Sequence, residues 1–142
     1  SASQNTLDLD RLPAEPGGRG PRSYSRSKIA LVMLSFEMAR RWGSEGILVN
    51  ALHPGTMLDT RMVRQKYGPP RGSAEEGAEV LEYLALSEDL EGISGAYFRR
   101  FEQARALDQA YDEATRARLW EITATMAGLG EPGPARVRGD ER

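Results

Sequence analysis

Residues 47–55 read ILVNALHPG, a short apolar run that ends in a histidine, a proline and a glycine. An apolar run of this length between turn signals is typical of a strand that is buried on both faces of a sheet. The segment before it, from about Ser23 to Trp42, repeats apolar residues every three or four positions and predicts a helix with one buried face. A helix joined to a buried strand by a short link is half of a parallel α/β unit, so the sequence predicts an α/β fold.

The rest of the chain adds a second set of elements to this unit. The sequence predicts a lid-like loop with room for a short helix, a capped helix, a second strand and a last helix over residues 56–72, 73–87, 92–98 and 112–127. The inward-facing residues of these two helices are predicted to be Val80, Leu81, Leu84, Ala85, Leu119, Ile122 and Met126. Two parallel strands do not make a stable sheet on their own. The pattern therefore predicts the back half of a doubly wound α/β domain, over residues 1–127, followed by a disordered tail at 128–142.

The composition excludes several classes of protein. The 142 residues carry 19 basic and 21 acidic side chains, a balance unlike that of a nucleic-acid-binding protein. The absence of cysteine excludes disulfides, thiol nucleophiles and cysteine-based zinc sites, and the single histidine excludes a His-rich metal site. No apolar run approaches the roughly 20 residues that span a bilayer. We therefore expect a soluble cytoplasmic protein with no membrane span, no metal and no nucleic-acid partner.

One residue pair in the first helix suits proton transfer. Tyr24 and Lys28 are four residues apart, so their side chains should lie on the same helix face. A nearby cation favours the phenolate over the phenol, which prepares a tyrosine to exchange a proton with a carbonyl or an alcohol. The pair alone is a weak signal, because the same spacing occurs in many helices where a half-exposed tyrosine stands beside a solvated lysine.

The pair and its surroundings together resemble a known family. With the stretch VNALHPG at residues 49–55, the leading Ser1-Ala2-Ser3 and the order of elements, the chain resembles the C-terminal half of a short-chain dehydrogenase/reductase over roughly residues 1–127. The long interval between the first serines and Tyr24, and the acidic segment at 7–12, resemble the retinol-dehydrogenase-like subgroup. This resemblance implies a doubly wound Rossmann-type parallel sheet whose N-terminal cofactor-binding half is missing.

The resemblance implies a role for each matching residue. Tyr24 would be the catalytic acid/base, Lys28 would support it and bind the nicotinamide ribose, and Ser1 would hold the substrate oxygen, with Ser3 as the alternative. The implied cofactor-binding residues are Tyr24, Lys28, Pro54, Gly55, Met57 and Thr60, although Thr60 lies one residue further from Gly55 than is common in the family. The implied cofactor is NADP or NAD, with NADP slightly preferred. The implied substrate is a small carbonyl compound or alcohol that can be lipophilic, and a homodimer or homotetramer follows by analogy.

The chain also departs from the family. The glycine-rich phosphate loop and the residues that select the cofactor would lie upstream of Ser1, and the glycines at 17, 18 and 20 do not follow a strand as a phosphate cradle requires. We therefore expect an NAD(P)-dependent oxidoreductase whose isolated fragment is inactive and binds no dinucleotide measurably. Two alternatives stay open: a non-catalytic binding or regulatory protein with the same fold, and a non-functional fragment.

Overall fold

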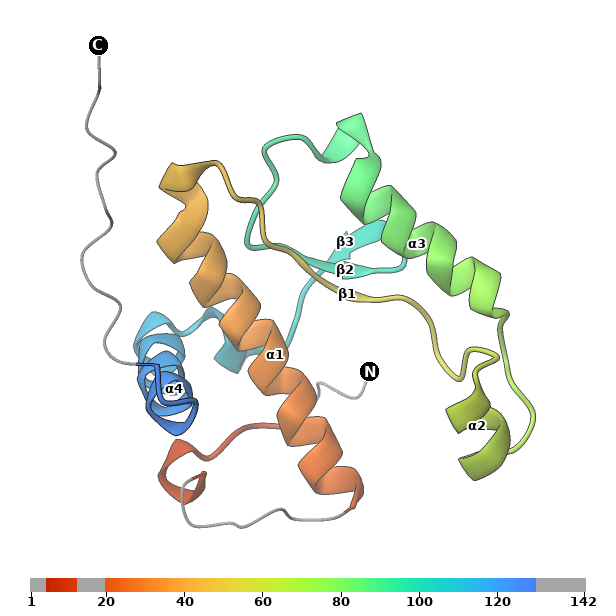
Figure 1. Ribbon diagram of the computed structural model, residues 1–142, viewed down its shortest axis with the longest axis horizontal. Coiled ribbons are helices and arrows are strands. Elements are labelled where there is room, and N and C mark those ends of the chain that lie inside the picture. Colours follow the sequence, from red (N-terminus) through yellow and green to blue (C-terminus); the bar gives the residue numbers. More distant parts are fainter. Residues whose placement is uncertain (1–4, 13–19, 130–142) are drawn as a thin grey trace.

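The computed structural model describes residues 5–12 and 20–129, which form four α-helices and one three-stranded sheet (Figure 1). The α-helices are α1 (Pro21–Trp42), α2 (Arg61–Lys66), α3 (Ala74–Leu86) and α4 (Glu113–Met126). The strands are β1 (Ala51–His53), β2 (Tyr97–Arg99) and β3 (Glu102–Ala104). Short 3₁₀ turns are η1 (Leu9–Arg11), η2 (Gly43–Glu45), η3 (Glu88–Leu90) and η4 (Asp108–Tyr111). Ser1 and Ser3 lie outside the described residues, as do residues 130–142 of the predicted tail.

The central helix α1 forms as its sequence predicts. Pro21 stands in the first turn, where its missing N–H costs no hydrogen bond. Arg40 and Arg41 stand in the last turn, where cations interact favourably with the helix dipole. The apolar stripe is buried, and its members are Ile29, Val32, Met33 and Phe36. Periodicity therefore identified both the helix and its buried face.

The sheet separates two apolar cores. β1 pairs with β2 in parallel and β2 pairs with β3 in antiparallel orientation. Ala51 and Tyr97 are register partners and both pack in the core that contains α1, whereas their neighbours Leu52 and Phe98 pack in the core beneath α3. Alternate residues of a strand point to opposite faces. The helices α1 and α3 consequently cover opposite faces of the small sheet.

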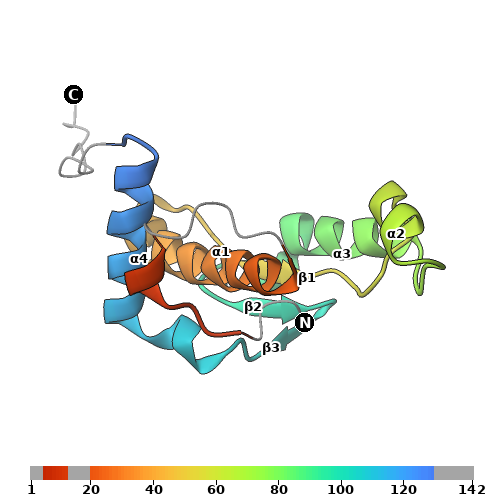
Figure 2. The ribbon, with the colours of Figure 1, turned by 90° about the horizontal axis from the view of Figure 1, so that it is seen from below.

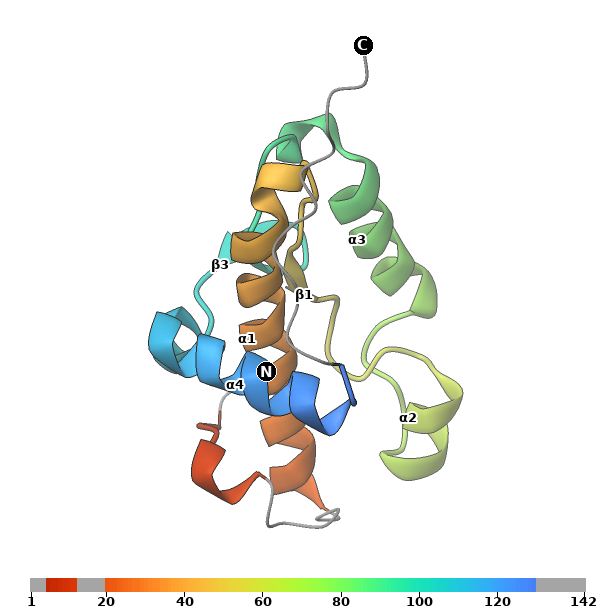
Figure 3. The same cartoon turned by 60° about the vertical axis from the view of Figure 1, so that its left-hand side comes forward.

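The helix α4 lies across α1 and closes the larger core (Figure 3). Leu119 of α4 is buried in this core, and Trp42 and Trp120 form an edge-to-face pair with ring centroids 6.0 Å apart. The two tryptophans therefore act as packing residues between α1 and α4. Seen from below, α4 and α2 lie at opposite ends of the molecule (Figure 2).

The first strand is shorter and less buried than its sequence predicts. The apolar run at 47–52 was predicted to be a strand buried on both faces, but β1 begins only at Ala51, and Ile47 and Leu48 are exposed. This prediction is wrong because burial of such a run requires neighbours on both edges of the strand. In the described part of the chain β1 pairs with β2 on one edge only. As an edge strand, β1 is only half-buried, although its two faces pack against different cores.

The second predicted strand is also displaced, and a third strand was missed. The predicted strand at 92–98 is observed as β2, Tyr97–Arg99, and a two-residue turn connects it to β3. Arg100 in this turn has a positive φ of 56°. The usual sequence signal of a two-residue hairpin turn is Asn-Gly or Asp-Gly, and neither pair occurs at this position. The sequence therefore contains no indication of the hairpin.

The capped helix α3 buries fewer residues than expected. Its capping box is present as predicted, because the Ser73 side chain accepts from the Glu76 N–H and the Glu76 side chain accepts from the Ser73 N–H. Val80 is fully buried and Leu84 packs against the smaller core, but Leu81 is exposed. Three residues that were predicted to face inward are exposed: Leu81 and Ala85 in α3 and Met126 in α4. The apolar residues of a helix are buried only where another element packs against them, and in these two helices that packing covers part of the predicted apolar face.

Asn50 joins the segment before β1 to the segment before β2. Its Nδ2 donates to the Ile93 carbonyl at 2.8 Å, and its Oδ1 accepts from the Ala96 N–H at 3.0 Å. Two further bonds run beside it, from the Val49 N–H to Ser94 Oγ and from the Gly95 N–H to the Val49 carbonyl. The Asn50 side chain thus makes the hydrogen bonds that backbone groups would otherwise make between the two chain segments where β1 and β2 begin to pair.

We predict that Asn50→Ala lowers the free energy of unfolding of the 142-residue chain by about 2 kcal/mol, because it leaves two half-buried backbone groups without partners. The measurement is a urea titration followed by circular dichroism. Glu79→Ala, on the exposed face of α3, is the control and should not move the midpoint measurably. Equal midpoints for the two variants would contradict the proposed bridge.

Candidate functional site

The structure brings Tyr24 and Lys28 together on the first turns of α1. The Lys28 Nζ atom lies 5.3 Å from the centroid of the Tyr24 ring, and the Tyr24 side chain is 51% exposed. The adjacent hydroxyl groups are used locally, because Ser25 Oγ donates to the Pro21 carbonyl and Ser27 Oγ donates to the Tyr24 carbonyl. Tyr24 therefore presents its phenol outward beside a cation.

The end of β1 points to the same end of the molecule as this pair. After α1 the chain turns through η2 and β1 returns in the opposite direction, so the first turns of α1 and the residues after His53 lie toward the same end (Figure 1). Ligands of open α/β sheets bind beyond the carboxyl ends of the strands. The first turns of α1, which carry Tyr24 and Lys28, therefore lie toward the end of the sheet at which such a ligand is expected (Figure 1).

His53 has a local role at the end of β1. Its Nε2 lies 3.2 Å from Thr56 Oγ1. Burial of the ring, with the positive charge of Arg99 as a smaller cause, lowers the pKa of His53 below its ordinary value of 6.5. The imidazole is consequently neutral at pH 7 and hydrogen-bonded to its own turn. The contact with Thr56 thus holds the ring locally at the end of β1.

The remaining predicted cofactor residues are held by contacts within their own loop. The space beside Gly55 is filled by the Leu58 side chain, since a Cβ atom at position 55 would lie 2.8 Å from Leu58 Cδ2. Met57 has a positive φ of 55°, and its carbonyl accepts from the Arg71 N–H at 2.9 Å. The Thr60 hydroxyl caps α2 by accepting from the Val63 N–H. These contacts explain the residues structurally, and their cofactor roles stay predictions.

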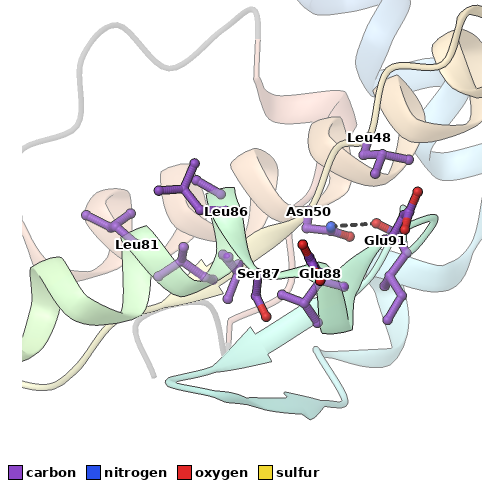
Figure 4. A pocket seen from close by; sticks show the side chains of 12 residues that line it. Leu48, Asn50, Leu81, Leu86, Ser87, Glu88 and Glu91 are labelled. Carbon is purple, nitrogen blue, oxygen red and sulfur yellow. Dashed lines mark hydrogen bonds between the residues drawn. The ribbon is translucent and has the colours of Figure 1, made fainter.

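Two hollows in the described structure lie away from the predicted site residues. One, of about 700 Å³, opens between α3 and the segment leading into β1, and Leu48, Leu81 and Leu86 stand around it (Figure 4). The other, of about 380 Å³, lies between α1 and α4 and is lined by Arg40, Arg116 and neighbours. None of the described site residues lines either hollow. These two hollows therefore lie apart from the Tyr24 pair.

Sequence reasoning missed three residues that hold the structure around the site. Asn50 was assigned only to an apolar run, Leu58 only to a loop, and Glu37 only to a helix face. A glycine inside the strongly capped helix α3, at position 77, was the one local signal of a close approach at Leu58. The pairing of Glu37 with Arg40 and Arg41 is local, but its burial had no local signal, because it depends on the packing of α4 with Arg116 against α1.

Two absences apply to the described residues. Within residues 5–12 and 20–129, no group of three or more His, Asp or Glu side chains could hold a metal ion. Over the same ranges, none of the helices combines the length and apolar content that a bilayer crossing requires.

The chain is similar to several oxidoreductases, although no protein-family profile matches it. It is 35% identical over 136 residues to Retinol dehydrogenase 14 of Mus musculus, and the match covers 87% of this chain and 40% of that protein. It is 34% identical over 134 residues to WW domain-containing oxidoreductase of Danio rerio, with 87% and 32% covered. Retinol dehydrogenase 13 of Homo sapiens is 32% identical over 130 residues, with 78% and 38% covered.

The chain thus spans about 40% or less of the length of the relatives described above. The matches cover most of its own length, between 78% and 87% of the chain. Together, the relatives and these motifs show that the chain belongs to the short-chain dehydrogenase/reductase family, among relatives named retinol dehydrogenases.

Proposed function

We propose that the chain is the catalytic C-terminal part of an NAD(P)-dependent oxidoreductase that interconverts an alcohol and a carbonyl compound. The observation that carries the proposal is the Tyr24–Lys28 pair on the first turns of α1, in which the half-exposed phenol stands beside the ammonium. Relatives named as retinol dehydrogenases and as an oxidoreductase support the reaction class. The non-catalytic alternative has less support, because a protein that only binds has no need of a phenol beside a cation.

Tyr24 would move the proton of the reaction. Its hydroxyl would donate a proton to the carbonyl oxygen during reduction, and its phenolate would accept the proton of the alcohol during oxidation, with the Lys28 ammonium stabilising the phenolate in both directions. Ser1 would hold the substrate oxygen by a hydrogen bond, with Ser3 as the alternative. A bound dinucleotide supplies or accepts the hydride.

The described residues fit one end of such a dinucleotide. The exposed phenol and ammonium suit hydroxyl groups, such as those of a nicotinamide ribose, and Pro54 would border the ring. The described residues provide no site for the phosphates of the dinucleotide. No glycine-rich strand–turn–helix occurs within residues 20–129, and Leu58 fills the space beside Gly55. The proposal therefore assigns phosphate binding, and the preference for NADP over NAD, to an upstream half of a longer polypeptide.

The proposed substrate is a lipophilic alcohol or its carbonyl form. Relatives carry the name retinol dehydrogenase. In this chain, the segment after the β1 end exposes Met62 and Tyr67, two large apolar side chains that could line the path of such a substrate. A homodimer or homotetramer stays part of the proposal by analogy with the family.

The test compares a longer polypeptide, in which an upstream cofactor-binding half precedes Ser1, with the 142-residue chain. We expect the longer polypeptide to oxidise NADPH or NADH in the presence of aldehydes or ketones, measured by loss of the reduced nicotinamide absorbance. Calorimetry should show no dinucleotide binding to the 142-residue chain. Tight cofactor binding by the longer polypeptide without turnover of any alcohol or carbonyl compound would favour the non-catalytic alternative.

A further inference from the structure

The Leu58 side chain is seated among three glycines from different parts of the chain. A Cβ atom built at Gly55 or Gly72 would lie 2.8 or 3.2 Å from Leu58 Cδ2, and one built at Gly77 would lie 2.5 Å from Leu58 Cδ1. Contacts under 3.0 Å essentially never occur for real Cβ atoms. The three positions thus form a socket, which we call the glycine socket: a side chain at Gly55 or Gly77 would collide with Leu58 as it is seated, and one at Gly72 would meet Glu76 Oε2 at 2.8 Å and press on Leu58.

Backbone conformation does not explain two of these glycines. Neither Gly72 nor Gly77 has a positive φ, so other residues could adopt their backbone angles. Gly77 lies inside α3, where glycine lowers helix stability relative to alanine. The close approach of Leu58 is the physical reason that the structure offers for glycine at position 77.

The same contacts close the neck of the segment between β1 and α3. The Asp59 N–H donates to the Gly72 carbonyl at 2.8 Å, and the Arg71 N–H donates to the Met57 carbonyl at 2.9 Å. Leu58 and Gly72 form an isolated parallel bridge between these bonds. Residues 59–71 therefore form a loop whose two ends are held side by side, and the Leu58 side chain packs where these ends meet.

The segment beyond the neck has little packing of its own. It contains the six-residue helix α2, in which Val63 is the one buried residue. A helix this short is not stable by itself. The position of α2 relative to the end of β1 consequently depends on the neck, which lies three residues after Gly55.

We propose that Leu58 is a positioning residue: seated in the glycine socket, it fixes the neck of segment 57–72 and so sets where this segment stands beside the Tyr24 end of the sheet. That the segment borders a substrate path rests on the proposed function. The closure of the neck rests only on the contacts above, so the two can be tested separately.

The experiment measures hydrogen exchange of the Asp59 and Arg71 amides in the 142-residue chain, together with the rate of trypsin cleavage in segment 59–71. Four variants are compared: Gly77→Ala, Leu58→Ala, the double variant, and Gly43→Ala. Gly43 is the matched control, because it has an ordinary φ of −57° and no atom within 4 Å of its added Cβ.

We expect Gly77→Ala and Leu58→Ala each to accelerate exchange and cleavage by about tenfold, because overpacking and cavity formation both open the neck. In the Leu58→Ala background, Gly77→Ala should cause no further acceleration, since the methyl group no longer meets Cδ1. Rates equal to those of Gly43→Ala, or equal acceleration by Gly77→Ala in both backgrounds, would overturn the proposal. If Gly77→Ala alone fails to fold, Leu58→Ala and the double variant decide the question.

A second measurement separates positioning from mere structural support. In the longer polypeptide, Leu58→Ala should raise KM for a carbonyl substrate by a larger factor than it lowers kcat, because the segment is displaced while the Tyr24 pair is untouched. An active variant with unchanged KM would overturn the positioning role. A longer polypeptide without any activity would contradict the proposed function, whereas the exchange rates would still decide whether Leu58 closes the neck.

Discussion

Tyr24→Phe in the longer polypeptide should lower kcat by at least about 10²-fold, the range typical of a lost general acid or base. The substitution removes only the hydroxyl, so the ring remains beside Lys28, whose Nζ lies 5.3 Å from its centroid. Because the side chain is half exposed at the surface of α1, we expect no loss of folding. The dissociation constant for the dinucleotide should change by less than about threefold, since the lost interaction acts in the transition state.

The measurement is steady-state turnover of a carbonyl substrate, with cofactor binding followed by calorimetry. Tyr83→Phe provides a matched control, because it removes the same hydroxyl from a tyrosine of α3, which packs against the core that contains Phe98 and to which the proposed site assigns no role. Its kcat should stay within about twofold of the unmodified protein. Comparable kcat values for the two variants would remove the main support for an enzymatic role.

Glu37→Gln should destabilise the 142-residue chain by about 3 kcal/mol, the cost of breaking a buried ion pair. Glu37 is fully buried on α1, and its carboxylate accepts from Arg40 and Arg41 at 2.7 Å. Arg116 of α4 is only 7% exposed, and its Nε lies 3.9 Å from Glu37 Oε2 without a hydrogen bond. The two arginines on α1 can turn to water, but Arg116 would lose its buried acidic neighbour in the interface between α1 and α4 and keep only Glu113, whose side chain is largely exposed, and the Ala110 carbonyl as partners.

Urea unfolding measures this effect as a lower midpoint, or as the loss of a cooperative transition. Asp108→Asn is the control, because it neutralises one acid of an ion pair, with Arg105, whose side chains are both largely exposed. An exposed pair contributes little, so its midpoint should not move measurably. A Glu37→Gln midpoint equal to that of Asp108→Asn would contradict the assigned role.

The same carboxylate makes the fold sensitive to acid. Burial alone would raise the pKa of Glu37, but the hydrogen bonds and charges of Arg40 and Arg41 outweigh it and lower the pKa below the ordinary value of 4.5. A group with a lowered folded-state pKa stabilises the fold above its unfolded value, and that stability is lost as the pH falls through the folded value. Stability should therefore fall below about pH 4.5, and Glu37→Gln should remove this part of the pH dependence.

The exposed apolar side chains around the larger hollow agree with the proposed longer polypeptide. Leu48, Leu81 and Leu86 are each more than half exposed (Figure 4), and β1 has a partner on one edge only within the described residues. The relatives are more than twice as long as the region they share with this chain. Additional chain that covered these leucines would complete the burial that the sequence pattern predicted.

The sequence by itself determined the features that depend on neighbours along the chain. The stripe of α1, the capping box at Ser73 and the shared face of Tyr24 and Lys28 follow from the geometry of one helix, in which residues three or four apart are adjacent. These were predicted correctly because no distant residue takes part in them.

Only the tertiary structure decided the features that depend on distant partners. The start of β1 at Ala51, the hairpin that forms β3, the seat of Leu58 against Gly77 and the burial of Glu37 beside Arg116 each join segments that are far apart in the chain. A strand ends where its partner ends, and a charged side chain is buried only where another element brings the opposite charge. Periodicity and propensity describe one segment at a time and carry no information about which segments meet.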